Sequence, residues 1–141
     1  MKFSFRRFFL FSACLLAFTV LLLTGCSLTH DSTKIQDLEF TVLNPDEIPT
    51  PLQEVIDENL TTEMKLSYQK DGKLCIARGF GEQKTGGYSI GVEHCYLGED
   101  GIHVKFQLIG PSKDTKLTEE SSYPYIVIQL DDPQVDEIIF E

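Results

Sequence analysis

The stretch GFGEQKTGGYSI, residues 79–90, decides which kind of fold this chain can have. Its glycines, lysine and threonine would suit a phosphate-binding loop, in which backbone N–H groups and a helix N-terminus hold the phosphates. Such a loop has a glycine directly before the lysine, where this chain has Gln83, and a helix after it, where residues 88–90 have the pattern of a strand. We therefore interpret the stretch as a turn, with positive φ angles at Gly86 and Gly87.

Apolar and polar residues alternate at period two on both sides of this turn, which is typical of half-buried strands. We predict that residues 74–78 and 88–97 pair as a hairpin around it. Asp71-Gly72 and Glu99-Asp100-Gly101 mark two further hairpin turns. The seven predicted strands are 38–43, 64–68, 74–78, 88–97, 102–108, 125–130 and 135–140. The pattern predicts a mainly β fold, an antiparallel β-sandwich or partial barrel of about seven strands with one short N-terminal helix.

The predicted helix follows Thr50, which we expect to be its N-cap. Pro51 would be the first helical residue and Gln53 would complete a capping box. Apolar residues then recur at helical spacing, and they are Leu52, Val55, Ile56 and Leu60. This stripe predicts a helix of about ten residues that packs on a sheet.

The first 25 residues have the pattern of a secretory signal peptide. Three basic residues precede an uncharged apolar run of 16 residues at positions 8–23, which is shorter than a spanning helix of about 20 residues. Leu23-Thr24-Gly25-Cys26 then resembles the lipobox of bacterial lipoproteins, in which cleavage occurs before a lipid-modified cysteine. The resemblance implies acyl chains such as palmitate on Cys26, and the alternative is an uncleaved membrane anchor.

We therefore divide the chain into a signal peptide at 1–25, a lipidated cysteine and polar tether at 26–37, and a β domain at 38–141. Either anchor places this domain on the extracytoplasmic face of the cell membrane. The segment from Cys26 onward holds all 22 acidic residues and nine of the 12 basic ones, for a formal charge of −13. This charge argues against nucleic acid as a partner and favours solubility.

Cys75 and Cys95 would face each other if the predicted hairpin turns near Thr85, so a disulfide between them is one hypothesis. The alternative is two reduced cysteines on one sheet face. His94 and His103 match no zinc-binding spacing, and we expect them to be exposed strand histidines. We expect no metal and no other cofactor.

Several turn and strand residues resemble the C-terminal domain family of the protease-complex subunit PrcB. The resemblance covers about residues 74–141. The matching elements are Gly81 with Thr85-Gly86-Gly87-Tyr88-Ser89-Ile90, then Gly110-Pro111, then Ser122-Tyr123-Pro124-Tyr125. Members of this family are small extracytoplasmic proteins, often lipoproteins, and the founding role is association with a surface protease and its stabilisation. The resemblance implies protein binding and no catalysis.

These observations predict a non-catalytic lipoprotein that binds another envelope protein and stabilises or modulates a surface protease complex. The alternative is a receptor for a small molecule or glycan. An enzyme is not expected, because the folded domain has two histidines and no Gly-x-Ser-x-Gly elbow. The candidate interaction surface comprises Lys84, Thr85, Gly86, Gly87, Tyr88, Tyr123, Pro124 and Tyr125.

Overall fold

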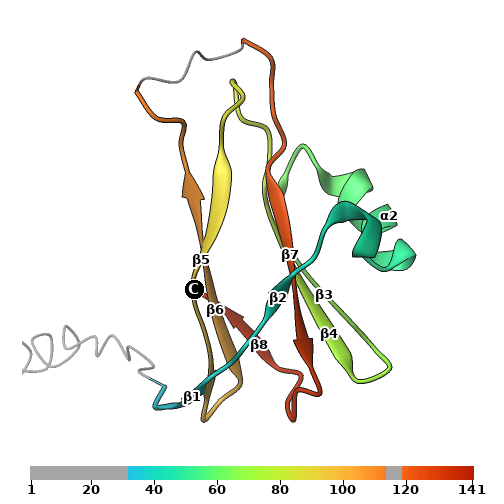
Figure 1. Cartoon of the computed structure of the whole chain (residues 1–141), viewed down its shortest axis with the longest axis vertical. Coiled ribbons are helices and arrows are strands. Elements are labelled where there is room, and N and C mark those ends of the chain that lie inside the picture. Colours follow the sequence, from blue (N-terminus) through green and yellow to red (C-terminus); the bar gives the residue numbers. More distant parts are fainter. Residues whose placement is uncertain (1–31, 114–118) are drawn as a thin grey trace, which may run out of the picture. The chain divides into compact units, whose positions relative to one another are not determined.

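The computed structural model describes residues 32–113 and 119–141 (Figure 1). Residues 32–141 form one compact unit. The predicted signal peptide and the lipid site at Cys26 lie outside the described residues. Within the described ranges, no helix is both long and apolar enough to cross a bilayer.

The described chain folds into two four-stranded sheets and one α-helix. The elements in chain order are β1 (Lys34–Asp37), β2 (Thr41–Val42), the 3₁₀ helix η1 (Pro45–Glu47), α2 (Thr50–Asn59), β3 (Glu63–Lys70), β4 (Lys73–Phe80), β5 (Ser89–Gly98), β6 (Ile102–Ile109), β7 (Tyr125–Asp131) and β8 (Ile138–Phe140). One sheet has the order β1-β5-β6-β8 and the other β2-β7-β4-β3. Strand pairs are antiparallel except for β6 and β8. The predicted mainly β fold with one helix is confirmed, and the sheets do not close into a barrel.

The second sheet is covered on both faces, because successive side chains of a strand point to opposite sides. Leu74 and Ile76 of β4 lie in the core between the two sheets. Cys75 and Ala77 lie on the other face, in a cluster with Leu52 and other residues of α2. Figure 1 shows α2 outside this sheet, away from the first one. Each fully buried leucine or isoleucine stabilises the fold by about 1.5–3 kcal/mol.

Two of the predicted hairpins are confirmed. Asp71 and Gly72 join β3 to β4 with φ angles of 52° and 75°, the left-handed pair that a two-residue hairpin turn requires. Between β5 and β6, the N–H of Gly98 donates to the carbonyl of Gly101 at 2.8 Å. In both turns the sequence places glycine where the backbone reverses.

The predicted hairpin between residues 74–78 and 88–97 is wrong. β4 pairs with β3 and β7, whereas β5 pairs with β1 and β6. Residues 81–88 therefore carry the chain from one sheet to the other. The reason is that β3 and β7 already occupy the two edges of β4, so β5 must join a separate sheet.

The helix is confirmed, but its predicted cap is not. α2 begins at Thr50, and the N–H groups of Leu52 and Gln53 donate to the carbonyl of Pro49 at 2.9 and 3.0 Å. Thr50 is therefore helical and Pro49 is the N-cap. A capping box is found at η1 instead. There a carboxylate oxygen of Glu47 accepts the backbone N–H of Asn44 at 2.8 Å.

The folded domain begins with β1, before residue 38, so the C-terminal part of the predicted tether at 26–37 belongs to the domain. Residues 34–37 form β1, which pairs with β5 and has four exposed side chains. The predicted strand at 38–43 is reduced to the two residues of β2, because residues 38–40 cross from one sheet to the other. Because all four side chains of β1 are exposed, the strand does not need alternating apolar and polar residues. Its sequence, KIQD, therefore gives no signal of a strand.

Candidate functional site

The two segments predicted as an interaction surface lie together at one end of the sandwich. Gln83 and Ser122 form a two-way backbone bridge, with N–H···O distances of 2.8 and 2.9 Å. The N–H of Phe80 donates to the carbonyl of Pro124 at 3.1 Å. We call this surface the loop end and define it as residues 82–88, 110–111 and 121–124. Figure 1 shows it beyond the upper tips of β5 and β7.

Side chains and close packing fix the loop end further. The hydroxyl of Ser122 donates to the carbonyl of Thr85 at 2.7 Å. Gly87 has a φ of 86°, and a Cβ there would lie 3.0 Å from the Cβ of Pro111. Gly86 is not among the glycines with positive φ, so the predicted left-handed pair reduces to Gly87. The strand β5 follows directly, which confirms the turn and not the phosphate loop.

The predicted surface residues differ in exposure. Lys84 is exposed, Gly87 is exposed, and Tyr123 is 40% exposed. Tyr88 is partly buried, with its ring beside Gly110. Tyr125 packs against the α2 cluster.

The remaining three, Thr85, Gly86 and Pro124, are partly buried. The loop end therefore presents one exposed tyrosine and one exposed lysine, while Tyr88 and Tyr125 are occupied in packing. Residues 114–118, which belong to the same long loop, lie outside the described residues.

Cys75 and Cys95 are free thiols in different sheets, so the geometry behind the predicted disulfide is wrong. Cys75 lies in the α2 cluster and Cys95 in the core between the sheets. Burial raises the pKa of both thiols, that of Cys95 to about 11. Because the thiolate is the reactive form, neither cysteine is suited to nucleophilic chemistry at neutral pH.

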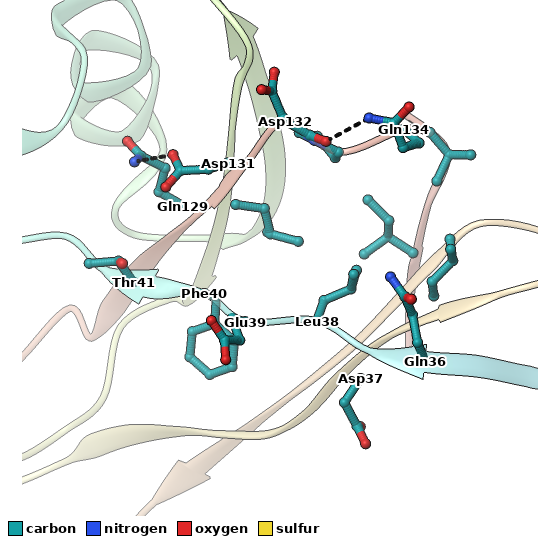
Figure 2. A pocket seen from close by; sticks show the side chains of 15 residues that line it. Gln36, Asp37, Leu38, Glu39, Phe40, Thr41, Gln129, Asp131, Asp132 and Gln134 are labelled. Carbon is teal, nitrogen blue, oxygen red and sulfur yellow. Dashed lines mark hydrogen bonds between the residues drawn. The ribbon is translucent and has the colours of Figure 1, made fainter.

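A cleft of about 440 Å³ lies away from the loop end, where the chain crosses twice between the sheets. Figure 2 shows residues 38–41 on one side of it and Asp131 and Asp132 on the other. Leu97, Ile102 and Leu130 provide apolar lining. Sequence reasoning did not identify this cleft, because its walls are brought together only by the tertiary fold.

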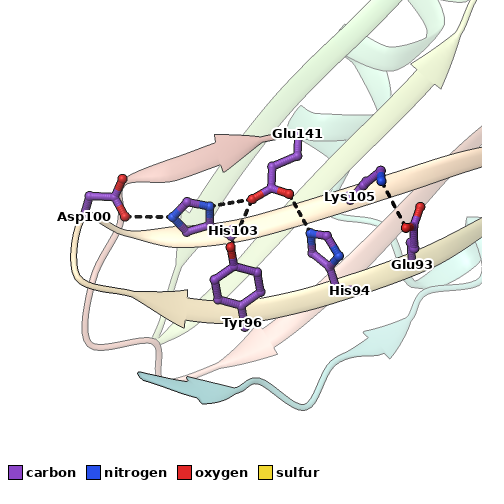
Figure 3. A network of polar contacts seen from close by, with 7 residues as sticks. All are labelled: Glu93, His94, Tyr96, Asp100, His103, Lys105 and Glu141. Atoms are coloured by element: carbon purple, nitrogen blue, oxygen red, sulfur yellow. Dashed lines mark hydrogen bonds and ion pairs between the residues drawn. The ribbon is translucent and has the colours of Figure 1, made fainter. Parts of the chain in front are cut away.

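His103 is the centre of a polar network that the sequence did not reveal (Figure 3). It is only 4% exposed, so the prediction of an exposed histidine was wrong. Its Nδ1 lies 2.7 Å from Glu141 Oε1, and its Nε2 lies 2.7 Å from Asp100 Oδ1. The ring stacks on Tyr96 with a centroid separation of 4.7 Å.

Glu141, which directly follows β8, contacts side chains of β5 and β6 in the same sheet. One carboxylate oxygen lies 2.9 Å from His94 Nε2, and the other accepts the Tyr96 hydroxyl at 3.1 Å in addition to the contact with His103. The hydroxyl of Ser32 donates to Asp100. We refer to Asp100, His103, Glu141, His94 and Tyr96 as the carboxylate–histidine network.

The network favours an imidazolium between two carboxylates. Burial alone lowers the pKa of His103, but the hydrogen bonds and charges of Asp100 and Glu141 outweigh it and raise that pKa. The bond from His103, followed by that from Ser32, lowers the pKa of Asp100 to about 2. The bond from His103 also lowers the pKa of Glu141.

This arrangement suits a structural role better than a chemical one, because both ring nitrogens of His103 are engaged. In the part of the chain that the structure describes, no three of its His, Cys, Asp and Glu side chains are grouped so as to hold a metal ion. Asp100 and His103 lie three residues apart, but Glu141 comes 38 residues after His103. No sequence pattern connects them.

Comparison of the chain with curated proteins and with solved structures finds no match. Comparison with protein families does find a match. It spans β4 and β7, the two central strands of the second sheet, and the whole β5–β6 hairpin. Residues 74–131, from β4 to the end of β7, match the PrcB C-terminal family.

Proposed function

We propose that this chain is a non-catalytic, lipid-anchored extracytoplasmic protein that binds another envelope protein and thereby stabilises or modulates a surface protease complex. The match of residues 74–131 to the PrcB C-terminal family supports this proposal, because the family is named for a subunit of a protease complex. The proposed anchor is acyl chains on Cys26, as the lipobox pattern predicts.

The loop end is the contact surface that we propose. The observation that carries this choice is the two-way bridge between Gln83 and Ser122, which joins two segments nearly 40 residues apart into one surface. A hydrogen bond of 2.6 Å from Ser121 to Glu82 lies beside it. A surface that is already ordered loses less conformational entropy on binding than a flexible loop does.

The exposed side chains of the loop end suit protein recognition. Tyr123 offers a large apolar ring with a hydrogen-bonding hydroxyl, and tyrosine is enriched in protein interfaces. Lys84 adds a positive charge on a chain whose formal charge is −10. Glu82, also exposed in the loop end, adds a negative charge, so this surface offers one side chain of each sign for ion pairs with a partner.

The absence of catalysis is part of the proposal. Hydrolysis would need a nucleophile, a base and a group that orients the base. The two candidate bases, His94 and His103, both contact Glu141, and His103 also contacts Asp100. The thiols of Cys75 and Cys95 are buried. These contacts support a binding role.

Proximity labelling from the chain in its native membrane tests the proposal. A labelling enzyme fused to residue 141 should mark a surface protease or a protein bound to it. The double variant Lys84→Glu with Tyr123→Ala should reduce that labelling several-fold, because both exposed side chains of the loop end are changed.

The matched control is Glu54→Lys with Val55→Ala on α2, which changes one charge and one exposed apolar side chain outside the loop end. Equal labelling of the protease by both variants would reject the loop end as the contact. Labelling of no envelope protein by the unaltered chain would reject the proposed function itself.

The receptor hypothesis receives less support from the structure. Two clefts of about 440 and 450 Å³ lie in the described part of the chain, and neither is lined by Tyr88, Tyr123 or Tyr125. A solute at 100 times its dissociation constant would stabilise the domain by about 2.7 kcal/mol. A thermal-shift screen of sugars and small solutes therefore separates this hypothesis from protein binding.

A further inference from the structure

The cleft of about 440 Å³ is formed by two crossings of the chain between the sheets. Residues 38–40 lead from β1 in one sheet to β2 in the other, and residues 132–137 lead from β7 to β8. The base between them comes from Leu97, Ile102 and Leu130, of which the last two are almost fully buried. Its volume is in the lower part of the range for ligand sites, about 300–1,000 Å³, and suits a short segment of a larger partner.

Apolar side chains remain exposed at this cleft. Phe40 and Val135 both line it and are 36% and 37% exposed. Ile35 in β1 and Val42 in β2, on either side of the first crossing, are more exposed still. A gathering of exposed apolar groups with a polar rim is typical of an interaction site.

The rim of the cleft is acidic. Glu39, Asp131 and Asp132 line it together with Asp37, and lysine and arginine are not among its lining residues. Lys34 neutralises Asp37 at 2.6 Å. Asp131 accepts a hydrogen bond from the amide of Gln129, which leaves its charge in place.

We propose that this cleft docks an extended peptide segment of a protein partner in which an apolar side chain is flanked by lysine or arginine. The apolar side chain lies on Leu38, Leu97 and Leu130, and the basic side chains lie against Glu39, Asp131 and Asp132. Charge complementarity selects this occupant, since a net charge of about −3 at an apolar groove disfavours acidic segments and attracts basic ones. The inference rests on the proposed function only in that the ligand is a protein.

The test uses the purified chain in a zwitterionic detergent, because residues 8–23 and the acyl chains proposed on Cys26 are both apolar. The probe is the synthetic peptide acetyl-AKLFRA-amide, titrated at low salt while backbone amides are followed by NMR. We expect shifts concentrated at Leu38, Leu130 and Val135. Affinity should fall as salt is raised, because the ion pairs lie at an accessible rim.

Two comparison peptides and one pair of variants define the contacts. Replacing both basic residues of the peptide by glutamate, or both central apolar residues by serine, should abolish detectable binding. The double variant Glu39→Gln with Asp132→Asn should weaken binding about 2- to 25-fold, since exposed ion pairs contribute about 0.2–1 kcal/mol each. Asparagine is chosen at position 132 because the φ of Asp132 is 46°, which asparagine tolerates.

The matched control removes the same charge elsewhere, with Glu54→Gln and Glu58→Gln on the exposed face of α2. Its affinity should stay within about twofold of the unaltered chain. An equal loss in both double variants, shifts away from the cleft, or no shift at millimolar peptide would overturn the inference. Because the experiment contains no protease and no change at the loop end, its failure leaves the proposed function standing, and the reverse also holds.

Discussion

At the loop end, segments that are distant in sequence are joined by backbone hydrogen bonds and by a hydroxyl, whereas the carboxylate–histidine network joins distant strands through charged side chains. Gln83 and Ser122 make the first kind of link, and His103 with Glu141 makes the second. The neutral links should be nearly independent of pH, and the charged links should depend on it strongly. One small sandwich therefore contains two kinds of link between distant segments, and only the charged kind should respond strongly to pH.

Removal of the imidazole should have the largest effect on this comparison. His103→Leu leaves Asp100 and Glu141 without their shared cation and should lower the free energy of unfolding by about 2–4 kcal/mol. This is less than the 3–5 kcal/mol typical of a fully buried pair, because both carboxylates are about one-third exposed. Urea unfolding measures the change.

His94→Leu is the matched control for that substitution. His94 makes one contact with Glu141 and its side chain is 30% exposed, so the loss should be below about 1 kcal/mol. Similar losses in the free energy of unfolding for the two variants would show that the buried contacts of His103 stabilise the fold no more than the single contact of His94.

The pH dependence of stability sharpens the same contrast. The pKa of His103 is raised on folding, so its contribution is complete below about 6.5 and is lost as pH rises through the raised value. The pKa values of Asp100 and Glu141 are lowered, so their contribution is present above about 4.3 and is lost as pH falls, for Asp100 through about 2. The stability difference between the unaltered chain and His103→Leu should therefore be largest between about pH 4.5 and 6.5. A difference that stays flat from pH 4 to 9 would contradict the charged network.

The loop end should respond to backbone strain. Gly87→Ala places a side chain at a φ of 86° and a Cβ 3.0 Å from Pro111, which should cost about 1–2 kcal/mol. Gly86→Ala has no positive φ to overcome and should change stability by less than about 1 kcal/mol. Thermal unfolding of the two variants at one pH separates these expectations. Equal losses would mean that the strained turn at Gly87 is not what orders the loop end.

The smallest expected effect concerns a single hydroxyl. Ser122→Ala removes the 2.7 Å bond to the carbonyl of Thr85 and should cost about 0.5–1.5 kcal/mol. The loss should be the same at pH 5 and pH 8, unlike that of His103→Leu. Ser121→Ala, which loses a bond to the exposed Glu82, serves as the control and should cost less. A pH-dependent loss of stability for Ser122→Ala would contradict the distinction between neutral and charged links.

The sequence was informative wherever the cause of a structure is local. The turn at Asp71-Gly72 and the stripe of Leu52 and Ile56 depend on a few neighbouring residues, and the structure contains both. Strand partners are not local, because alternation shows that β4 and β5 are strands without showing which sheet each one joins. That gap led to the wrong hairpin and to the wrong geometry for Cys75 and Cys95.

The site shows the same limit. Its turn residues were predictable because Gly87 and Pro111 carry backbone constraints that can be recognised in a sequence. The burial of His103 was not, because it depends on Glu141, which reaches the histidine only after β8 pairs in parallel with β6. The cleft depends on two sheet crossings and could not be predicted either.

Photo-crosslinking in the native membrane, at the contact proposed for the loop end, tests the central claim most directly. A photo-crosslinking amino acid at position 84 is compared with one at position 54 on α2, both of which are exposed. The account predicts an adduct with a surface protease or its associated protein from position 84 and none from position 54. Adducts that form equally from both positions, or only between copies of this chain, would contradict it.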